Sequence, residues 1–307
     1  IGVFNENKKI VKYGYYLYHG FTNYISKDLE SSRKHTVLVP DNEKLIDQAI
    51  QKRIKDASLR KDKSSLYRKV EVTTESTFAA AIRCKNISRK VCVLNFASAT
   101  QPGGDVLNGR NAQEEVLSRQ STLYFSLVQM KDFYDHNKMK KDPFGTDYMI
   151  YSPNVIIIRD DNDKLINLTV KVSVISSVAV NYAEILEKYK GQKMERQVYD
   201  TMRKRCRRIL ELCIKEGNDI IVLGAFGCGV FQNSPEMISQ IFHKIIIDEG
   251  YGEMFTKIVF AIKIKHDQST ELIDAFKNAF KPHHLDSQTA KPASGTGTRL
   301  SSGTSGT

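Results

Sequence analysis

The sequence predicts an α/β protein, a three-layer α/β/α sandwich in which helices cover both faces of a sheet. The first observation is a set of five apolar segments rich in β-branched residues: Val91–Phe96, Val155–Ile158, Val172–Val180, Ile220–Leu223 and Lys257–Ile262. Unbroken apolar runs of this kind are typical of strands that are buried on both faces. The second observation is that helical patterns lie between these segments, and such alternation is typical of layered α/β folds.

Periodicity and capping signals predict the helices of this sandwich. The pattern over 42–60 places apolar residues near helical spacing, and Val198–Ile214 places six of them on one stripe. Ser234-Pro235-Glu236 combines an N-cap residue, a proline at the first helical position and an acid in the first turn. Shorter patterns predict a strand over Lys69–Thr73 and a capped helix over Ser76–Cys84.

The cysteines argue against a disulfide framework and against a zinc site. There are five, an odd number without C-x-x-C spacing: Cys84, Cys92, Cys206, Cys213 and Cys228. Cys206 and Cys213 are seven positions apart and share one helix face, where buried free cysteines are common. We therefore expect free thiols, a reducing intracellular location in the cytoplasm or nucleus, and no bound metal.

The chain is strongly basic, with 46 Lys and Arg against 35 Asp and Glu and a formal net charge of +11. The basic residues concentrate at 52–69 and 188–208, and two explanations are open. They form either a surface that binds polyanions, nucleic acid included, or the solvated faces of surface helices. No apolar run approaches the roughly 18–20 residues that span a bilayer, so we expect no membrane segment. The first five residues have the composition of a trimmed start rather than of a signal peptide.

Two glycine-rich segments follow predicted strands. The first is Asn95-Phe96-Ala97-Ser98-Ala99-Thr100-Gln101-Pro102-Gly103-Gly104-Asp105, and the second is Gly224-Ala225-Phe226-Gly227-Cys228-Gly229-Val230-Phe231. Glycines just past strand ends let the backbone approach a ligand and present N–H groups to an anion. Neither segment has the pattern of a Walker loop or of a dinucleotide-binding fingerprint. Each segment alone is also compatible with a tight turn from strand to helix.

Gln113-Glu114-Glu115 opens a predicted helix shortly after the first glycine segment. Two acids at the start of a helix complement its dipole, which is the structural explanation. The functional explanation is glycosidic bond cleavage, where an acid donates a proton to the leaving oxygen and its carboxylate then activates water. An acid with this role stays protonated near neutral pH only if its pKa is raised.

Taken together, these motifs resemble the signature of microbial-type poly(ADP-ribose) glycohydrolases, a branch of the macrodomain superfamily. The family pattern is a strand, Asn-Phe-Ala-Asn-Ala, a Pro-Gly-Gly-Gly turn, six to eight residues and Gln-Glu-Glu. The segment Leu-Gly-Ala-aromatic-Gly-Cys-Gly-Val-Phe resembles the diphosphate loop of the family. The resemblance covers roughly 70–281 and implies a three-layer α/β/α macrodomain with a mixed central sheet and an N-terminal helical extension.

The resemblance also implies roles for individual residues. Glu115 corresponds to the catalytic acid/base, and Glu114 to the acid that orients hydroxyls of the distal ribose. The ligand-binding positions that it implies are Asn95, Ala97, Ser98, Gly103, Gly104, Asp105, Gln113, Gly227, Cys228, Gly229, Val230 and Phe231. Among them the glycines hold the diphosphate and distal ribose, and Phe231 packs beside the ribose. The family requires no metal or other cofactor.

Two positions depart from the family pattern. Ser98 replaces an asparagine, and its hydroxyl can still donate a hydrogen bond over a shorter reach. Asp105 replaces the third glycine and brings a Cβ and a negative charge. Its carboxylate then repels the ligand, reshapes the acceptor side of the site, or points to solvent. A local role remains open as well, because aspartate often caps its own turn.

Three functions are compatible with these residues. The first is hydrolysis of ribose–ribose bonds in poly(ADP-ribose), with the polymer or ADP-ribosylated macromolecules as partners. The others are removal of single ADP-ribose groups from protein or nucleic acid, and non-catalytic binding of ADP-ribose. We expect an N-terminal extension over 1–69, a catalytic domain over 70–281 and a disordered tail rich in Ser, Thr and Gly over 282–307.

Overall fold

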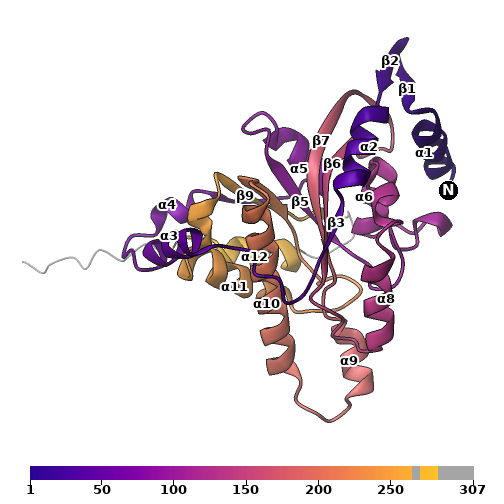
Figure 1. Cartoon of the computed structure of the whole chain (residues 1–307). Coiled ribbons are helices and arrows are strands. Elements are labelled where there is room, and N and C mark those ends of the chain that lie inside the picture. The colour runs from indigo at the N-terminus through magenta and orange to yellow at the C-terminus, as the bar shows by residue number, and fades with distance from the viewer. Residues whose placement is uncertain (265–269, 283–307) are drawn as a thin grey trace, which may run out of the picture.

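A seven-stranded mixed sheet forms the centre of the computed structural model, which describes residues 1–264 and 270–282 (Figure 1). The strand order is β3-β6-β7-β5-β8-β9-β4. The strands are β3 (Val37–Val39), β4 (Val70–Thr73), β5 (Val91–Phe96), β6 (Met149–Arg159), β7 (Leu165–Ser177), β8 (Ile220–Leu223) and β9 (Lys257–Ala261). β6 runs antiparallel to its two neighbours, whereas the other neighbouring pairs are parallel. The tail was predicted to begin at residue 282, and all of it after that residue, 283–307, lies outside the described residues.

Helices cover both faces of this sheet, and each face has its own apolar core. One core joins the sheet to α3 (Gln48–Ser58), α4 (Ser64–Tyr67), α9 (Tyr182–Lys188), α10 (Glu195–Lys215), α11 (Pro235–His243) and α12 (Glu271–Ala279). The other joins it to α5 (Thr77–Cys84), α7 (Leu123–Leu127), α8 (Lys131–Lys140) and α6 (Gln113–Gln120). Within β5, Cys92 and Leu94 face the first core while Val91 and Val93 face the second. The predicted three-layer sandwich with a mixed sheet is confirmed.

The N-terminal segment packs against β6 and contributes a strand to the sheet. It consists of α1 (Gly2–Tyr13), the hairpin β1 (Tyr15–Tyr18) and β2 (Phe21–Tyr24), and α2 (Ser26–His35) before β3. A small third core joins Ile10, Tyr16 and Leu29 of this segment to Ile156 and Ile158 of β6. Figure 1 shows the hairpin projecting from the body at the upper right.

Most predicted strands and helices are confirmed, and the differences are at their ends. β6 begins six residues before the predicted Val155, although Pro153 and Asn154 are poor strand residues. A register shift between Ser152 and Val155 accommodates them as a bulge, and Asn154 has a φ of 54°. β7 begins at Leu165, seven residues before the predicted Val172, and ends at Ser177 rather than at Val180.

The predicted caps and free cysteines are confirmed. The Ser76 hydroxyl accepts a hydrogen bond from the Ala79 backbone N at 3.2 Å, and the Ser234 hydroxyl accepts one from the Met237 backbone N at 3.1 Å. All five cysteines are free. Short 3-10 helices are present at Val106–Asn108 and Tyr251–Met254, and a π-helix at Lys244–Asp248. No helix in the described part of the chain is both long and apolar enough to cross a bilayer.

Candidate active site

The two glycine-rich segments lie side by side at one edge of the sheet. β5 and β8 are parallel neighbours, paired from Val91 with Ile220 to Val93 with Val222. The loops that leave their carboxyl ends therefore meet at the same edge, where open α/β sheets bind ligands. Together with the start of α6, these loops border a cleft of about 1060 Å³.

Gln113 fixes the start of α6 to the end of β5. Its Oε1 accepts a hydrogen bond from the Phe96 backbone N, and its Nε2 donates one to the Leu94 carbonyl, each at 2.8 Å. Nε2 also donates to Thr77 Oγ1 at 3.2 Å. Both ends of this amide are therefore bonded to the protein. Gln113 lines the cleft and aims the two glutamates that follow it.

Glu114 is buried beneath the first loop, with both carboxylate oxygens bonded. Asn95 Nδ2 donates to its Oε1 at 3.1 Å, and the Ser98 backbone N donates to its Oε2 at 2.6 Å. Asn95 is itself fully buried and also donates to Ser176 Oγ. Burial raises the pKa of Glu114 to about 8, and the hydrogen bonds from Ser98 and Asn95 oppose part of that rise. Glu114 is thus a carboxyl that holds a proton near neutral pH.

Glu115 has one bonded oxygen and one free oxygen. Its Oε1 accepts a hydrogen bond from the Asp105 backbone N at 3.0 Å. Its Oε2 is buried and has no hydrogen-bond partner among the described residues. Buried polar atoms are nearly always satisfied, so an unpaired oxygen in the wall of a cleft indicates a place for a ligand or water.

Gly104 allows the first loop to pass directly over Glu115. Its φ is 58°, a left-handed conformation that side chains disfavour. A Cβ at this position would overlap Glu115 Oε1. Gly103, with a φ of 68°, is packed beneath the cleft, where a Cβ would lie 2.8 Å from Tyr124 Cδ2. Gly104 is therefore required by its contact with the acid, and Gly103 by its packing against Tyr124 and Ser118.

The second loop lines the cleft with residues whose backbone N–H groups have no hydrogen-bond acceptor among the described residues. In the described part of the chain, the backbone N–H groups of Gly229, Val230 and Phe231 donate no hydrogen bond. All three residues line the cleft, as does Gly227. Adjacent N–H groups of this kind suit an anion such as a diphosphate. Cys228 does not line the cleft, and burial raises the pKa of its thiol to about 12, so it is not a reactive thiolate.

The carboxylate of Asp105 is held by its own loop. Asn108 Nδ2 donates to its Oδ1 at 2.6 Å, and Arg110 Nε lies 3.3 Å from its Oδ2. Its φ is −101°, so this position does not need a glycine. Arg110 partly neutralises this charge, which counts against repulsion of a ligand, one of the alternatives that the sequence left open. The carboxylate contacts the side chains of Asn108 and Arg110 and forms no cap to the backbone, so the self-capping turn is not observed.

Ser98 also has a local role in shaping the first loop. Its hydroxyl accepts hydrogen bonds from the backbone N of Thr100 and Gln101, at 3.3 and 3.2 Å. Ala97 and Ser98 both line the cleft, and the Ser98 backbone N is the donor that holds Glu114. Ser98 therefore acts through its backbone as much as through its side chain.

Some residues that line the cleft were not predicted as site residues by any sequence pattern. Asp161, in the turn between β6 and β7, accepts a hydrogen bond from Ser76 Oγ at 2.5 Å and pairs with Lys263 Nζ at 3.2 Å. These three residues line the cleft but lie in three distant segments. Phe96, whose ring centre is 5.6 Å from that of Phe226, was within the first motif but was not singled out. Conversely, Asn95, Gly103 and Cys228 support the cleft from behind and do not line it.

Among the described residues, no cluster of His, Cys, Asp and Glu side chains has the arrangement of a metal site. The cleft instead combines a carboxyl with a free oxygen, a buried carboxyl beside it, and unbonded N–H groups across from them. This arrangement can donate and accept a proton while backbone dipoles hold an anionic ligand.

Comparison with known proteins identifies relatives of this fold and cleft. The family model "Microbial-type PARG, catalytic domain" matches residues 5–160. The poly(ADP-ribose) glycohydrolase of Thermomonospora curvata, solved with the inhibitor ADP-HPD, is 30% identical with a TM-score of 0.77, over 90% of this chain and 97% of that one. The enzyme of Deinococcus radiodurans, solved with ADP-ribose, is 34% identical with a TM-score of 0.68, over 82% and 96%. No curated protein matches the sequence.

Proposed function

The chain belongs to the family of microbial-type poly(ADP-ribose) glycohydrolases, and from this premise we propose how its cleft performs the reaction. The protein is a glycosidase that hydrolyses the ribose–ribose bonds of poly(ADP-ribose) and releases ADP-ribose. Its partners are therefore ADP-ribosylated substrates. The observation that carries the proposal is the unpaired Oε2 of Glu115 in the wall of a cleft bordered by two glycine loops.

Glu115 is the acid/base. Its Oε2 donates a proton to the ribose oxygen that leaves the anomeric carbon, and the carboxylate then takes a proton from the attacking water. The hydrogen bond from the Asp105 backbone occupies Oε1 and leaves Oε2 without a partner in the described part of the chain, so we assign the proton transfer to Oε2. Gly104 keeps this geometry because no side chain separates the loop from the carboxyl.

The other cleft residues position the substrate. Glu114 contacts the distal ribose hydroxyls, held in place by Asn95 and by the Ser98 backbone. The free N–H groups at 229–231 bind the diphosphate, and Phe231 packs beside the ribose. Fixed donors of this kind stabilise charge without reorganising during the reaction.

Glu115→Gln tests this assignment. Glutamine has nearly the same shape and cannot transfer the proton, so release of ADP-ribose from purified polymer should fall by about 10²–10⁴-fold or more, while calorimetry should show ADP-ribose binding largely retained. Glu187→Gln, an exposed change on α9, is the matched control and should keep wild-type turnover. Near wild-type turnover by Glu115→Gln would exclude Glu115 as the acid/base. Absence of polymer hydrolysis by the wild-type protein would exclude the function.

We also propose an intracellular location, in the cytoplasm or nucleus. The support is that all five cysteines are free and four of them are buried, which is usual in a reducing compartment. We further propose that 1–69 are an extension of a catalytic domain over 70–281. Measuring the redox state of the cysteines in cells would test the first of these two proposals.

A further inference from the structure

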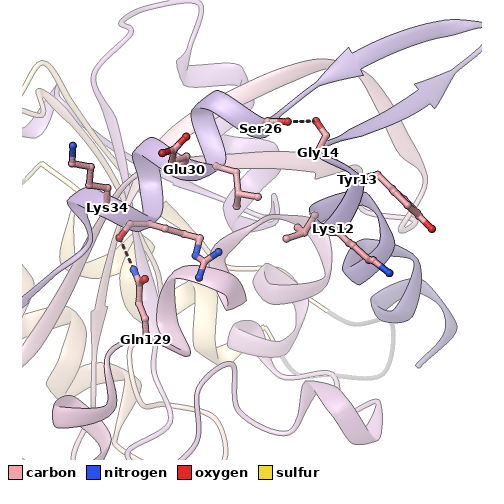
Figure 2. A pocket seen from close by; sticks show the side chains of 10 residues that line it. Lys12, Tyr13, Gly14, Ser26, Glu30, Lys34 and Gln129 are labelled. Atoms are coloured by element: carbon pink, nitrogen blue, oxygen red, sulfur yellow. Dashed lines mark hydrogen bonds between the residues drawn. The ribbon is translucent and has the colours of Figure 1, made fainter.

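A second hollow lies between α1 and α2, far along the chain from the catalytic glutamates. This α1–α2 groove has a volume of about 500 Å³, and its apolar lining includes Val11 and Leu29. The residues that line it include three cations, Lys12, Arg33 and Lys34, and one carboxylate, that of Glu30. Figure 2 shows Glu30 and Lys34 on α2 and Lys12 at the end of α1. Among the described residues, none of these three cations forms an ion pair. The groove therefore has an unbalanced positive charge beside an apolar surface.

The walls of the groove are fixed to one another and to the body. Ser26 Oγ donates to the Gly14 carbonyl at 3.1 Å, which joins the start of α2 to the end of α1. Gln129 Nε2 donates to the Arg33 carbonyl at 2.5 Å, and Figure 2 shows both contacts. A groove with braced walls binds a ligand with less ordering cost than a mobile surface does.

Three exposed tyrosines continue the surface from the groove onto the β1–β2 hairpin. Tyr13, Tyr15 and Tyr24 are 62%, 42% and 77% exposed. The ring centres are 6.5 Å apart for Tyr13 and Tyr15 and 6.1 Å apart for Tyr15 and Tyr24. Lys12 Nζ lies over the Tyr13 ring, 5.8 Å from its centre. Exposed aromatic rings beside cations that form no ion pair are an arrangement on which bases of a polyanionic strand stack.

α1 connects this surface to the catalytic cleft. Ile1, which precedes α1, lies beside Gly109 in the loop that covers Glu115, where a Cβ on Gly109 would be 3.5 Å from Ile1 Cγ1. The 12 residues of α1 then rise by about 18 Å to Tyr13. Exposed Lys8, Lys9 and Lys12 lie along this path. A polymer with one end in the cleft can therefore follow a basic helix to the groove.

We propose that the α1–α2 groove and the three tyrosines bind a segment of poly(ADP-ribose) beyond the unit held in the cleft. This proposal rests on the proposed function. The diphosphate of that segment contacts Lys12, Arg33 and Lys34, and adenine rings stack on the tyrosines. The groove volume is within the range that holds a nucleotide-sized ligand. A second contact on the same polymer raises the effective concentration of its end at the cleft.

The test compares long and short substrates. In the variant Arg33→Gln/Lys34→Gln, and separately in Tyr15→Ser/Tyr24→Ser, KM for polymer of tens of units should rise about fivefold or more. The kcat on that polymer, and both constants on a substrate of two ADP-ribose units, should stay at wild-type values. The rise in KM for long polymer caused by Arg33→Gln/Lys34→Gln should become smaller at high salt, because salt screens the attraction between these cations and the phosphates. Lys52→Gln/Arg53→Gln, exposed on α3, removes the same charge elsewhere and should leave KM unchanged.

A binding experiment keeps this proposal separate from the proposed function. In a Glu115→Gln background, the groove variants should bind labelled long polymer more weakly by fluorescence anisotropy and bind ADP-ribose unchanged. This measurement tests whether the groove binds polymer even if the wild-type protein does not hydrolyse it. Equal affinity of wild-type and groove variants for long polymer would overturn the proposal. Weaker binding of single-stranded oligo(A) RNA with unchanged KM for polymer would also overturn it and assign the groove to nucleic acid.

Discussion

Glu114 and Glu115 are adjacent in the sequence, but the structure holds them differently. Both oxygens of Glu114 accept hydrogen bonds from fixed donors, whereas one oxygen of Glu115 remains unpaired. A carboxyl with a free oxygen can transfer a proton to a substrate, and a fully bonded neighbour can only position one. Burial isolates Glu114 from water and makes its ionised form unfavourable, so the stability of the fold should depend on pH.

We predict that protein stability depends on pH through Glu114. Its pKa is about 8 in the folded state, against an ordinary value of 4.5. Between these values the folded protein holds a proton that the unfolded chain lacks, so the free energy of unfolding falls as pH rises. The slope from this group is at most about 1.4 kcal/mol per pH unit. Urea unfolding from pH 5 to pH 8 should show a flatter dependence for Glu114→Gln, and identical slopes would contradict the prediction.

Asp105 leads to a prediction about affinity. Because Asn108 and Arg110 hold its carboxylate, we expect Asp105→Asn to change ADP-ribose affinity by less than about threefold, well under 1 kcal/mol. Asp105→Gly should cost some stability, because it removes the contacts with Asn108 and Arg110 and adds a flexible glycine to the loop. Calorimetry at two salt concentrations measures the affinity. Tightening by tenfold or more at low salt would show that the carboxylate repels the diphosphate after all.

At the scale of loops, glycine is needed for different reasons in the two motifs. Gly104 combines a φ of 58° with contact against Glu115, whereas Gly229 has open space around the position of a Cβ. In the first loop glycine allows backbone and acid to approach each other. In the second it leaves the N–H groups open to a ligand.

Gly104→Ala should therefore lower both stability and turnover. The left-handed backbone costs about 1–2 kcal/mol with a Cβ, and the displaced Glu115 should reduce turnover by tenfold or more. Gly229→Ala is the matched control for stability and should change the free energy of unfolding by less than about 0.5 kcal/mol. Thermal unfolding and polymer hydrolysis measure the two effects. Equal stability of the two variants would mean that the loop over Glu115 accommodates a Cβ at residue 104 with little cost in free energy.

At the scale of the whole molecule, the N-terminal segment forms part of the body that carries the site. The buried side chain of Asn7 in α1 donates to the Arg119 carbonyl at 2.6 Å and accepts from Arg159 Nε at 2.9 Å. Arg119 belongs to α6, whose first turn carries Glu114 and Glu115. The match to the family model also begins within α1, at residue 5. The position of α6 thus depends on contacts with the first helix.

Asn7→Ala should lower stability by about 2–3 kcal/mol, because it leaves two buried polar groups without partners. It should also lower kcat through the shift of α6, with a smaller change in KM. Asn5→Ala, an exposed position on the same helix, should be close to neutral. Urea unfolding and steady-state kinetics measure both variants. A neutral Asn7→Ala would mean that α1 does not support the site.

The sequence alone determined the layers of the fold and the region of the site. Apolar runs, helix caps and the two glycine segments are local patterns, and each acts over a few neighbouring residues. The strand Val91–Phe96 and the caps at Ser76 and Ser234 could be predicted because their causes lie within one segment. The sequence placed both glycine loops at strand ends, and the tertiary structure made those two strands parallel neighbours, which brings the loops together.

Only the tertiary structure decided which atoms face the ligand. It set the free oxygen on Glu115, placed Asn95 beneath Glu114, and paired Asp105 with Arg110. It also completed the cleft with Asp161 and Lys263, which lie about a hundred positions apart in the chain. Such contacts depend on the order of strands and on how far each side chain is buried. Periodicity along one segment carries no information about either, so these features could not be predicted before the chain was folded.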